Sequence, residues 1–261
     1  MPAERLTVDE LLAVLWDDPG VVLADPDGAG AVAAVVRRVG DVAVAFLKLA
    51  VVHPSAQRQG LGRHLLAAAE SWAWDEGAGE VHLAGSAPFY LWPGVDISFT
   101  AMHCLVEAGG YVETGAVFDM TVPAAFRADG PDGVVLRRVV EDADAAAVDS
   151  LVAARWPEWS AEQRRGTEQG TCVAAFDADT GSAVAFACHS VNRAGWFGPT
   201  GTDDAWRHRG IGLALLGQVC TDLSVAGYSD VEIAWIGPVG FYAAAGGRLS
   251  RVFRTYRRAK R

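Results

Sequence analysis

The chain has 261 residues and a formal charge of −10 at pH 7, because 32 acidic residues outnumber 22 basic ones. Hydrophobic residues make up 51% of the chain and charged residues 21%, so the chain can fill a packed core and is not expected to be disordered. This length corresponds to one large domain or two smaller ones. An acidic chain without a basic block is a poor surface for releasing counterions from nucleic acid, which disfavours DNA and RNA as partners.

The cysteines and histidines show no spacing typical of a metal site or of a disulfide framework, so we expect no metal and reduced thiols. Residues 1–15 lack the basic start and the long apolar stretch of a signal peptide. The most apolar run, 42–52, is interrupted by Lys48 and is too short to cross a bilayer. The sequence therefore predicts a cytoplasmic protein without a membrane partner, as a monomer or a homodimer.

Two similar decapeptides lie 150 residues apart in the chain. Residues 57–66 read QRQGLGRHLL and residues 207–216 read RHRGIGLALL, so both keep two glycines and two final leucines. Each decapeptide follows a strand-like segment, which ends at Val52 or Thr202, and a four-residue loop. Each is followed by apolar residues at helical spacing and then by another strand-like segment. Two matches in the same context indicate the duplication of a whole domain.

A segment rich in proline, glycine and aspartate, residues 122–133, separates the two copies and is typical of a linker. We therefore place the first domain at residues 1–123 and the second at residues 133–261, each near the common domain size. The repeated order of strand, glycine loop, helix and strand predicts an α/β fold.

A glycine loop that opens a helix directs several unpaired backbone N–H groups to one point, where the helix dipole adds positive partial charge. Such a loop binds anions and suits a phosphate or a pyrophosphate. Gly60 and Gly62, like Gly210 and Gly212, lack a Cβ atom, so a ligand can approach the backbone closely. The arginines of the second loop add positive charge to it.

Glycine-rich helix starts occur in several classes of protein. A Walker loop requires Lys-Ser or Lys-Thr after the glycines, and the residues there are Arg63-His64 and Leu213-Ala214. A dinucleotide-binding fingerprint fits less well, because it has no four-residue loop between the strand and the glycines. A helix start that binds no ligand is the third alternative.

Both loops resemble the Q/R-x-x-G-x-G/A signature of the GCN5-related N-acetyltransferase (GNAT) superfamily. The resemblance covers nearly the whole chain as two tandem GNAT-like domains. It implies, in each, a mixed sheet whose two central strands splay apart, with acetyl-CoA in the gap as co-substrate and no metal. The residues that it assigns to CoA binding are Val52, Gln57, Arg58, Gln59, Gly60, Leu61, Gly62 and Arg63 in the first copy, and Thr202, Arg207, His208, Arg209, Gly210, Ile211, Gly212 and Leu213 in the second.

In this superfamily a tyrosine in an F-Y-x-x-x-G segment often protonates the departing thiolate, and residues 241–246 supply that segment with Tyr242. In the first copy, counting back four residues from Gly110 places Val106 at the corresponding position. The resemblance thus implies that the second domain is catalytic and that the first is a non-catalytic copy still able to hold CoA. The alternative role for Tyr242 is that of a half-buried core residue.

The general base is less well defined. Glu232 lies between apolar neighbours on the strand that follows the second glycine helix, where it could accept a proton directly or through water. An outward-facing strand residue is the favoured alternative for Glu232. Glu158 and Asp204 are weaker candidates, and no base is needed if the amine arrives deprotonated.

Substrate-binding candidates gather in the second domain. Trp156, Glu158 and Trp159 lie where the first two helices of the superfamily form a substrate wall, and Trp196 and Trp235 flank the expected cleft. Indole rings offer flat faces to sugars or cations, and carboxylates favour an ammonium group, although core packing is the alternative for each tryptophan. The layout is similar to tandem acetyltransferases that act on amino sugars such as glucosamine. We expect N-acetylation of a small primary amine; protein lysine acetylation and a non-catalytic CoA-binding regulatory module are the alternatives.

Overall fold

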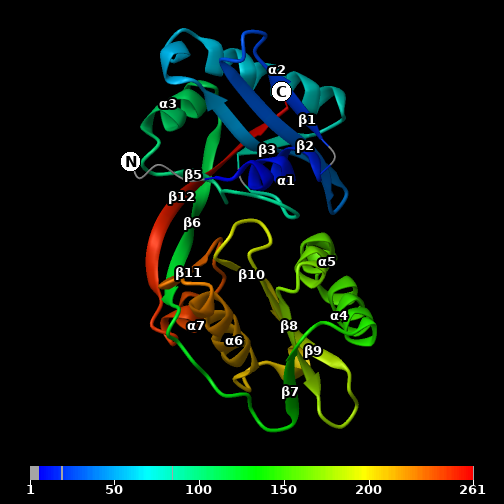
Figure 1. Cartoon of the computed structure of the whole chain (residues 1–261). Helices are drawn as coiled ribbons and strands as arrows, with labels where there is room; N and C mark the ends of the chain where they lie inside the picture. Colours follow the sequence, from blue (N-terminus) through cyan, green and yellow to red (C-terminus); the bar gives the residue numbers. More distant parts are fainter. Residues whose placement is uncertain (1–5, 19, 84, 261) are drawn as a thin grey trace. The chain divides into compact units, whose positions relative to one another are not determined.

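The structure is a computed structural model that describes residues 6–18, 20–83 and 85–260 (Figure 1). The described residues up to Phe118, together with those from Arg251 onward, form the first of two units. The second unit contains Asp119–Ser250. This division differs from the predicted domains 1–123 and 133–261 at both ends of the second domain, and the physical reason is an exchange of strands described below.

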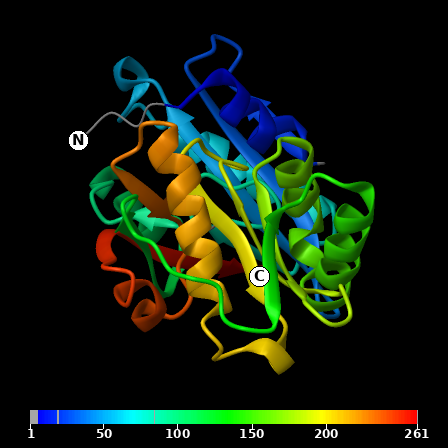
Figure 2. The ribbon, with the colours of Figure 1, turned by 60° about the horizontal axis from the view of Figure 1, so that its bottom comes forward.

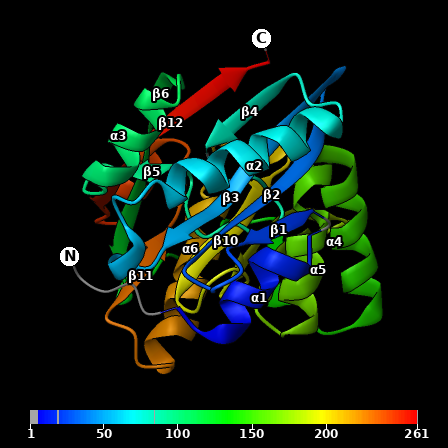
Figure 3. The same ribbon diagram turned by 90° about the horizontal axis from the view of Figure 1, so that it is seen from above.

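The first unit has helices on a mixed sheet. Its strand order is β1-β2-β3-β4-β12-β6, in which β3 and β4 are parallel, and the short β5 pairs with β12. Helix α2 packs on β2 and β3, as Figure 3 shows, and buries Leu65, Leu66 and Ala69 against the sheet. The elements are α1 (Val8–Trp16), β1 (Val21–Ala24), β2 (Gly30–Val39), β3 (Val42–Val52), η1 (Pro54–Ala56), α2 (Leu61–Asp75), β4 (Glu80–Leu83), β5 (Val95–Asp96), α3 (Thr100–Ala108), most of β6 (Val112–Pro123) and most of β12 (Arg248–Ala259).

The second unit repeats this plan with the strand order β7-β8-β9-β10-β11-β6. Helix α6 covers one face of these strands, as Figure 2 shows, while Gly166 of α5 packs on Cys188 of β9, on the other face. The elements are β7 (Val134–Arg138), α4 (Asp142–Arg155), η2 (Pro157–Trp159), α5 (Ser160–Glu168), β8 (Cys172–Asp177), β9 (Ala183–His189), β10 (Trp196–Thr202), η3 (Asp204–Trp206), α6 (Ile211–Val225), β11 (Asp230–Ile233) and α7 (Val239–Ala243).

The strand that ends each repeat completes the sheet of the other unit. In the first unit β12, the last strand of the chain, pairs with β4, with Tyr256 opposite Leu83. In the second unit the end of β6 pairs with β11, with Met120 opposite Ile233. Arg258 of β12 is held in the first unit by two hydrogen bonds to the carboxylate of Glu70 on α2, at 2.9 and 2.7 Å.

Each sheet opens between its two central parallel strands. Among the described residues, the pairing of β3 with β4 ends at Phe46 and His82. The pairing of β10 with β11 includes Trp196 with Glu232 and ends one residue later. These two pairs are separated by 150 residues in both partners, so the strands part at almost the same place in the two repeats.

Candidate functional site

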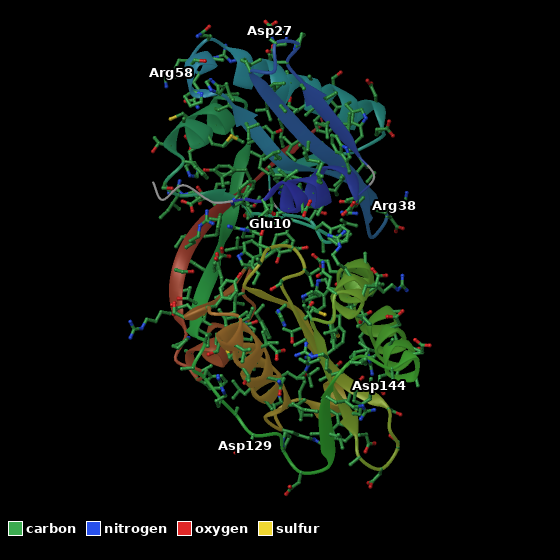
Figure 4. The ribbon with its side chains drawn as sticks, viewed as in Figure 1. Glu10, Asp27, Arg38, Arg58, Asp129 and Asp144 are labelled. Atoms are coloured by element: carbon green, nitrogen blue, oxygen red, sulfur yellow. The ribbon has the colours of Figure 1, made fainter. Side chains whose placement is uncertain are left out.

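The two glycine loops have the same backbone conformation. Each leaves a central strand, passes through one 3-10 turn and enters a long helix, α2 or α6. Arg58 and His208 have φ angles of 63° and 62°, and the helix-capping residues Gly60 and Gly210 have φ angles of 91° and 85°. All four lie in the left-handed region, which glycine adopts without steric cost. Arg58 lies exposed at the surface of the first unit (Figure 4).

Side chains at matched positions brace the first loop. Gln57 Nε2 donates to the carbonyl oxygen of Val52 at 3.0 Å, and Gln59 Nε2 donates to the carbonyl oxygen of Ser55 at 2.9 Å. Both bonds tie the loop to the chain just before it. The polar residues of the first motif therefore shape the loop from within, by satisfying backbone carbonyls that a tight turn leaves unpaired.

Arginines brace the second loop in the same way. Arg207 Nε donates to the carbonyl oxygen of Thr202 at 3.4 Å, and Arg209 Nη2 donates to the carbonyl oxygen of Ala205 at 3.2 Å. Arg207 also forms an ion pair with Asp204 at 2.9 Å, and the Arg209 guanidinium lies 4.6 Å from the centre of the Trp206 ring. Asp204 therefore offsets part of the positive charge that Arg207 adds to the loop.

The helix starts are open to a ligand. Neither Gly60 nor Gly210 has a side chain that could cap the helix, and the first helical bonds run from the fourth residue on, from His64 and Ala214. An ideal Cβ atom at Gly60 or Gly210 would meet none of the described neighbouring atoms within 4 Å, so the space beside each of these glycines is open. Uncapped amides at a helix start fit a phosphate group, and these loops can therefore hold the pyrophosphate of a CoA molecule.

The second glycine of each motif has a packing role in addition to the role expected from the sequence. An ideal Cβ atom at Gly62 would come within 3.3 Å of Leu105 on α3, and one at Gly212 within 3.1 Å of the Phe241 ring on α7. These glycines let a short helix pack closely on the long one. Close approach of a ligand to Gly62 and Gly212 stays a prediction beside this packing role.

Tyr242 lies on α7 and is 6% exposed. Its ring packs edge-on against Phe241 at 4.8 Å and against Phe197 of β10 at 6.3 Å, measured between ring centres. Burial raises the pKa of the Tyr242 hydroxyl to about 12, because the anion would lose its hydration. Its hydroxyl oxygen has no hydrogen-bond partner among the described residues, yet it is not sealed from solvent as the Tyr111 hydroxyl is.

The counterpart of Tyr242 in the first unit is Val106. The carbonyl oxygen of Tyr242 accepts the N–H of Gly247 at 2.9 Å, and that of Val106 accepts the N–H of Tyr111 at 3.1 Å. Four residues after each of them a glycine, Gly246 or Gly110, has a φ angle of 79°. The equivalence predicted from the sequence is thus present in the backbone, and the fully buried Val106 side chain has no proton to transfer.

Glu232 lies on the opposite face of β11 from Tyr242. Its neighbours Val231 and Ile233 belong to the buried cluster that contains Tyr242, and side chains alternate along a strand. Glu232 itself is half-buried and pairs in register with Trp196. Since Tyr242 and Glu232 lie on different faces of the sheet, only a reactant lying in the gap between β10 and β11 could contact both.

The predicted tryptophan wall lies between α4 and α5. The rings of Trp156 and Trp159 stack with centres 5.8 Å apart, and Glu158 between them is exposed. An ideal Cβ atom at Gly201 of β10 would lie 2.7 Å from the Trp156 ring, so that indole rests directly on the strand. Beyond β11, Trp235 is 39% exposed. The structure therefore leaves these tryptophans partly accessible, beside the strands that part.

The first unit contains a buried charge cluster that the sequence did not lead us to expect. Lys48 Nζ lies 2.7 Å from Asp18 Oδ2 and 3.3 Å from the carbonyl oxygen of Pro88. Arg37 also pairs with Asp18 and donates to the Ser86 hydroxyl. Asp18 and Lys48 are buried, so the cluster occupies the interior. Its signal in the sequence is a single lysine within an apolar strand.

The charge cluster lies at a β-bulge of β3, and the matching β-bulge of β10 in the second unit carries no such side chain. The register of β3 skips Lys48, since Leu47 and Leu49 pair with successive residues of β2. The register of β10 skips Gly198 and Pro199 at the matching place. An ideal Cβ atom at Gly198 would meet nothing within 4 Å. Both bulges lie just beyond the point where the parallel strands part, so the first unit has a charged side chain where the second has open space.

A segment present only in the first unit adds to the cluster. The offset between the repeats is 150 residues up to β4 and β11 but 136 at Gly110 and Gly246, so the first repeat has 14 additional residues between β4 and α3. Ser86 and Pro88, two partners of the cluster, come from this stretch. A hollow of about 430 Å³ lies beside Asp18, and none of its lining residues belongs to a glycine loop.

The described residues offer neither a metal site nor a membrane span. No group of three or more histidine, cysteine, aspartate or glutamate side chains among them is arranged to hold a metal ion. No helix in this part of the chain has the length and apolar character needed to span a membrane.

Comparison with known proteins identifies a family for part of the chain and a fold for all of it. Residues 3–91 match the profile of the Acetyltransferase (GNAT) family. No protein of curated function matches the sequence. A solved structure described as a GCN5-related glucosamine N-acetyltransferase region of a fungal multi-domain GH3 β-N-acetylglucosaminidase has a TM-score of 0.77 and 19% identity. The alignment covers 97% of this chain but 35% of the fungal chain, so this chain spans about a third of that protein.

Two further structures cover most of both partners. A GCN5-related N-acetyltransferase from Sphaerobacter thermophilus has a TM-score of 0.65 and 23% identity over 92% of this chain and 80% of its own. A tandem GNAT protein from the clavulanic acid biosynthesis pathway has a TM-score of 0.63 and 18% identity over 91% and 85%. The predicted fold class, α/β with mixed and splayed sheets in a tandem arrangement, is confirmed.

Proposed function

Because residues 3–91 match the GNAT family and the chain shares the fold of solved GNAT proteins, we propose that its second unit transfers an acetyl group from acetyl-CoA to a primary amine of a small molecule. The observation that carries this assignment is the presence of Tyr242 where the first unit has Val106, in matching backbone surroundings. In this proposal the first unit is a non-catalytic copy whose glycine loop can still bind CoA.

Acetyl-CoA, when bound, supplies a thioester whose carbonyl carbon forms a bond to the amine nitrogen as the carbon–sulfur bond breaks. The uncapped amides at Gly210 and at the start of α6 would hold the pyrophosphate. Tyr242 would donate its hydroxyl proton to the departing sulfur, and its raised pKa keeps that proton in place at neutral pH. Glu232, on the other face of β11, would accept the proton of the amine directly or through water.

The charge cluster of the first unit supports the division of roles. Lys48 occupies the bulge beside the opening of the first sheet, and the additional segment between β4 and α3 joins it there. The matching position in the second unit, Gly198, leaves open space beside the opening. An acceptor amine would therefore find room in the second unit and a buried ion pair in the first.

We further propose an amine with a flat or cationic surface, such as an amino sugar. Trp156, Trp159 and Trp235 offer aromatic faces beside the opening, and the exposed Glu158 offers a carboxylate to an ammonium group. The fold is shared with a region described as a glucosamine N-acetyltransferase, so this fold can accommodate an amine of that class. Protein lysine acetylation remains the second candidate, for which the acidic chain is the favourable observation.

The test measures CoA release from acetyl-CoA with a panel of small amines and a lysine peptide. Tyr242→Phe should lower kcat by at least about a hundredfold, as expected for the loss of a general acid. Tyr228→Phe, which removes one hydroxyl from a more exposed position of the same unit, serves as the control and should leave kcat unchanged. Turnover by Tyr242→Phe at the wild-type rate would remove the proposed acid. CoA binding without turnover of any amine would favour a regulatory module instead.

A further inference from the structure

A buried acidic side chain other than the proposed catalytic residue Glu232, that of Asp119, binds the backbone of the second unit where β11 leaves the sheet. Asp119, on β6, has no solvent exposure, and its Oδ1 accepts the backbone N–H of Trp235 at 2.9 Å. The ladder between these strands ends at Met120 and Ile233, so Asp119 lies opposite the first residue beyond it, Ala234. A side-chain oxygen thus replaces the backbone carbonyl that would continue the ladder.

The residue held by Asp119 has an uncommon conformation. Trp235 has a φ angle of 51°, in the left-handed region that bulky residues rarely adopt. Such a conformation is energetically unfavourable and persists only where its surroundings impose it. The other residues with positive φ angles include Arg58 and His208, in the two glycine loops. The hydrogen bond that the Trp235 N–H donates to the buried Asp119 side chain helps to hold this conformation.

Trp235 lies at the opening of the sheet. The pairing of β10 with β11 ends at Phe197 and Ile233, so Trp235 is two residues past the point where the strands part. On the other strand the same interval contains Gly198, whose surroundings are open. Trp235 is 39% exposed, so part of the residue is accessible to solvent.

The first unit lacks both members of this pair. The position that matches Trp235 is Gly85, where an ideal Cβ atom would lie 2.6 Å from the backbone oxygen of Trp92. The position that matches Asp119 is Thr255, by the registers of β12 with β4 and of β6 with β11. The hydroxyl of Thr255 donates instead to the carbonyl oxygen of Gly115. The carboxylate and the indole therefore occur together only in the unit to which we assign the chemistry.

We propose that Asp119 is a positioning residue, which fixes the backbone of Trp235 so that the indole forms one wall of the acceptor site. This inference rests on the proposed function, since it takes the gap beside Trp235 as the place where the amine binds. The acceptor class that follows is one with a flat apolar face or an alkylammonium group, which an indole ring contacts favourably.

The experiment combines kinetics with fluorine NMR of 5-fluorotryptophan-labelled full-length protein. Trp235→Phe assigns the Trp235 resonance. Asp119→Ala should shift or broaden that resonance and raise the KM for the amine by about tenfold, as the loss of one buried hydrogen bond allows. The KM for acetyl-CoA and kcat should stay within about twofold. Asp119→Asn, which keeps the Oδ1 acceptor, should restore most of the wild-type behaviour.

A double mutant tests whether Asp119 affects the KM for the amine through Trp235. If Asp119 acts through Trp235, Asp119→Ala in a Trp235→Ala background should raise the KM no further. An unchanged resonance in Asp119→Ala, or full additivity in the double mutant, would overturn the proposal. If Asp119→Ala does not fold, Asp119→Ser, whose hydroxyl is too short to reach the Trp235 amide, replaces it with the same expectations. Absence of amine acetylation by the wild-type protein would refute the proposed function, and the NMR spectra would still decide whether Asp119 holds Trp235.

Discussion

The duplicated loops allow one substitution to be made twice in nearly identical surroundings. Gly210→Ala and Gly60→Ala each place a methyl group on a residue whose φ angle, 85° or 91°, suits glycine. Neither methyl group would meet an atom within 4 Å, so backbone strain is the main cost to folding in both variants. That strain amounts to about 1 kcal/mol, which should lower the melting temperature of either variant by about 3 °C.

The two variants should differ in function. If the pyrophosphate binds at the amides of α6, a methyl group on Gly210 should crowd it, and the loss of one such charge-assisted hydrogen bond costs about 1.5 to 3 kcal/mol. The KM for acetyl-CoA should therefore rise about tenfold to a hundredfold. Gly60→Ala should leave both KM and kcat at the wild-type values, because the first unit has no acid at Val106.

The assay pairs thermal unfolding with initial rates at varied acetyl-CoA concentration. Equal losses of stability with unequal losses of rate would support the assignment of catalysis to the second unit. If Gly60→Ala lowers the rate as much as Gly210→Ala, the division of roles between the units is wrong. If Gly210→Ala loses stability alone, the loop does not bind the pyrophosphate.

Two further predictions concern stability. Arg258→Leu leaves the nearly buried carboxylate of Glu70 without its partner and should lower the free energy of unfolding by about 2 kcal/mol. Arg257→Ala, at the neighbouring residue, breaks a more exposed pair with Glu80 at 3.3 Å and should lower the free energy of unfolding by less than about 1 kcal/mol. Urea unfolding compares the two variants, and equal losses of stability would contradict the reasoning. Because burial raises the pKa of Tyr242 from near 10 to about 12, the folded state favours the neutral hydroxyl, and its contribution to stability should be complete below pH 10 and be lost as the pH rises to about 12. Tyr242→Phe should make the free energy of unfolding depend less on pH in that range. An unchanged pH dependence would show that another group titrates there.

Local patterns in the sequence predicted the functional loops well. The shared decapeptides, the strands before them and the helices after them follow from glycine spacing and hydrophobic periodicity, which act over a few residues. The match of Val106 with Tyr242 required only counting back from a glycine that ends a helix. Each of these features depends on neighbours in the chain, so the sequence alone could locate them.

Features that depend on distant partners were not predictable in this way. The hydrophobic pattern of β12 would suit either sheet, so nothing local shows that its Tyr256 pairs with β4. Lys48 and Asp18 are 30 residues apart and become partners only when β3 and the segment after α1 meet. Asp119 and Trp235, 116 residues apart, meet only because β6 ends beside β11. The only local signal of that contact was an acidic residue, Asp119, between the apolar residues Phe118 and Met120.

The exchanged strands limit how the protein can be divided. A fragment that stopped at residue 123 would lack β12, and β4 would present a bare row of backbone donors and acceptors to other chains. Proteolysis in the segment 124–133 would produce two pieces that are interlocked, since each contributes a strand to the sheet of the other. A protein truncated to the second half of the chain would leave β12 without β4 and β11 without β6. A smaller version of the protein would therefore have to be engineered by reconnecting strands rather than by truncation.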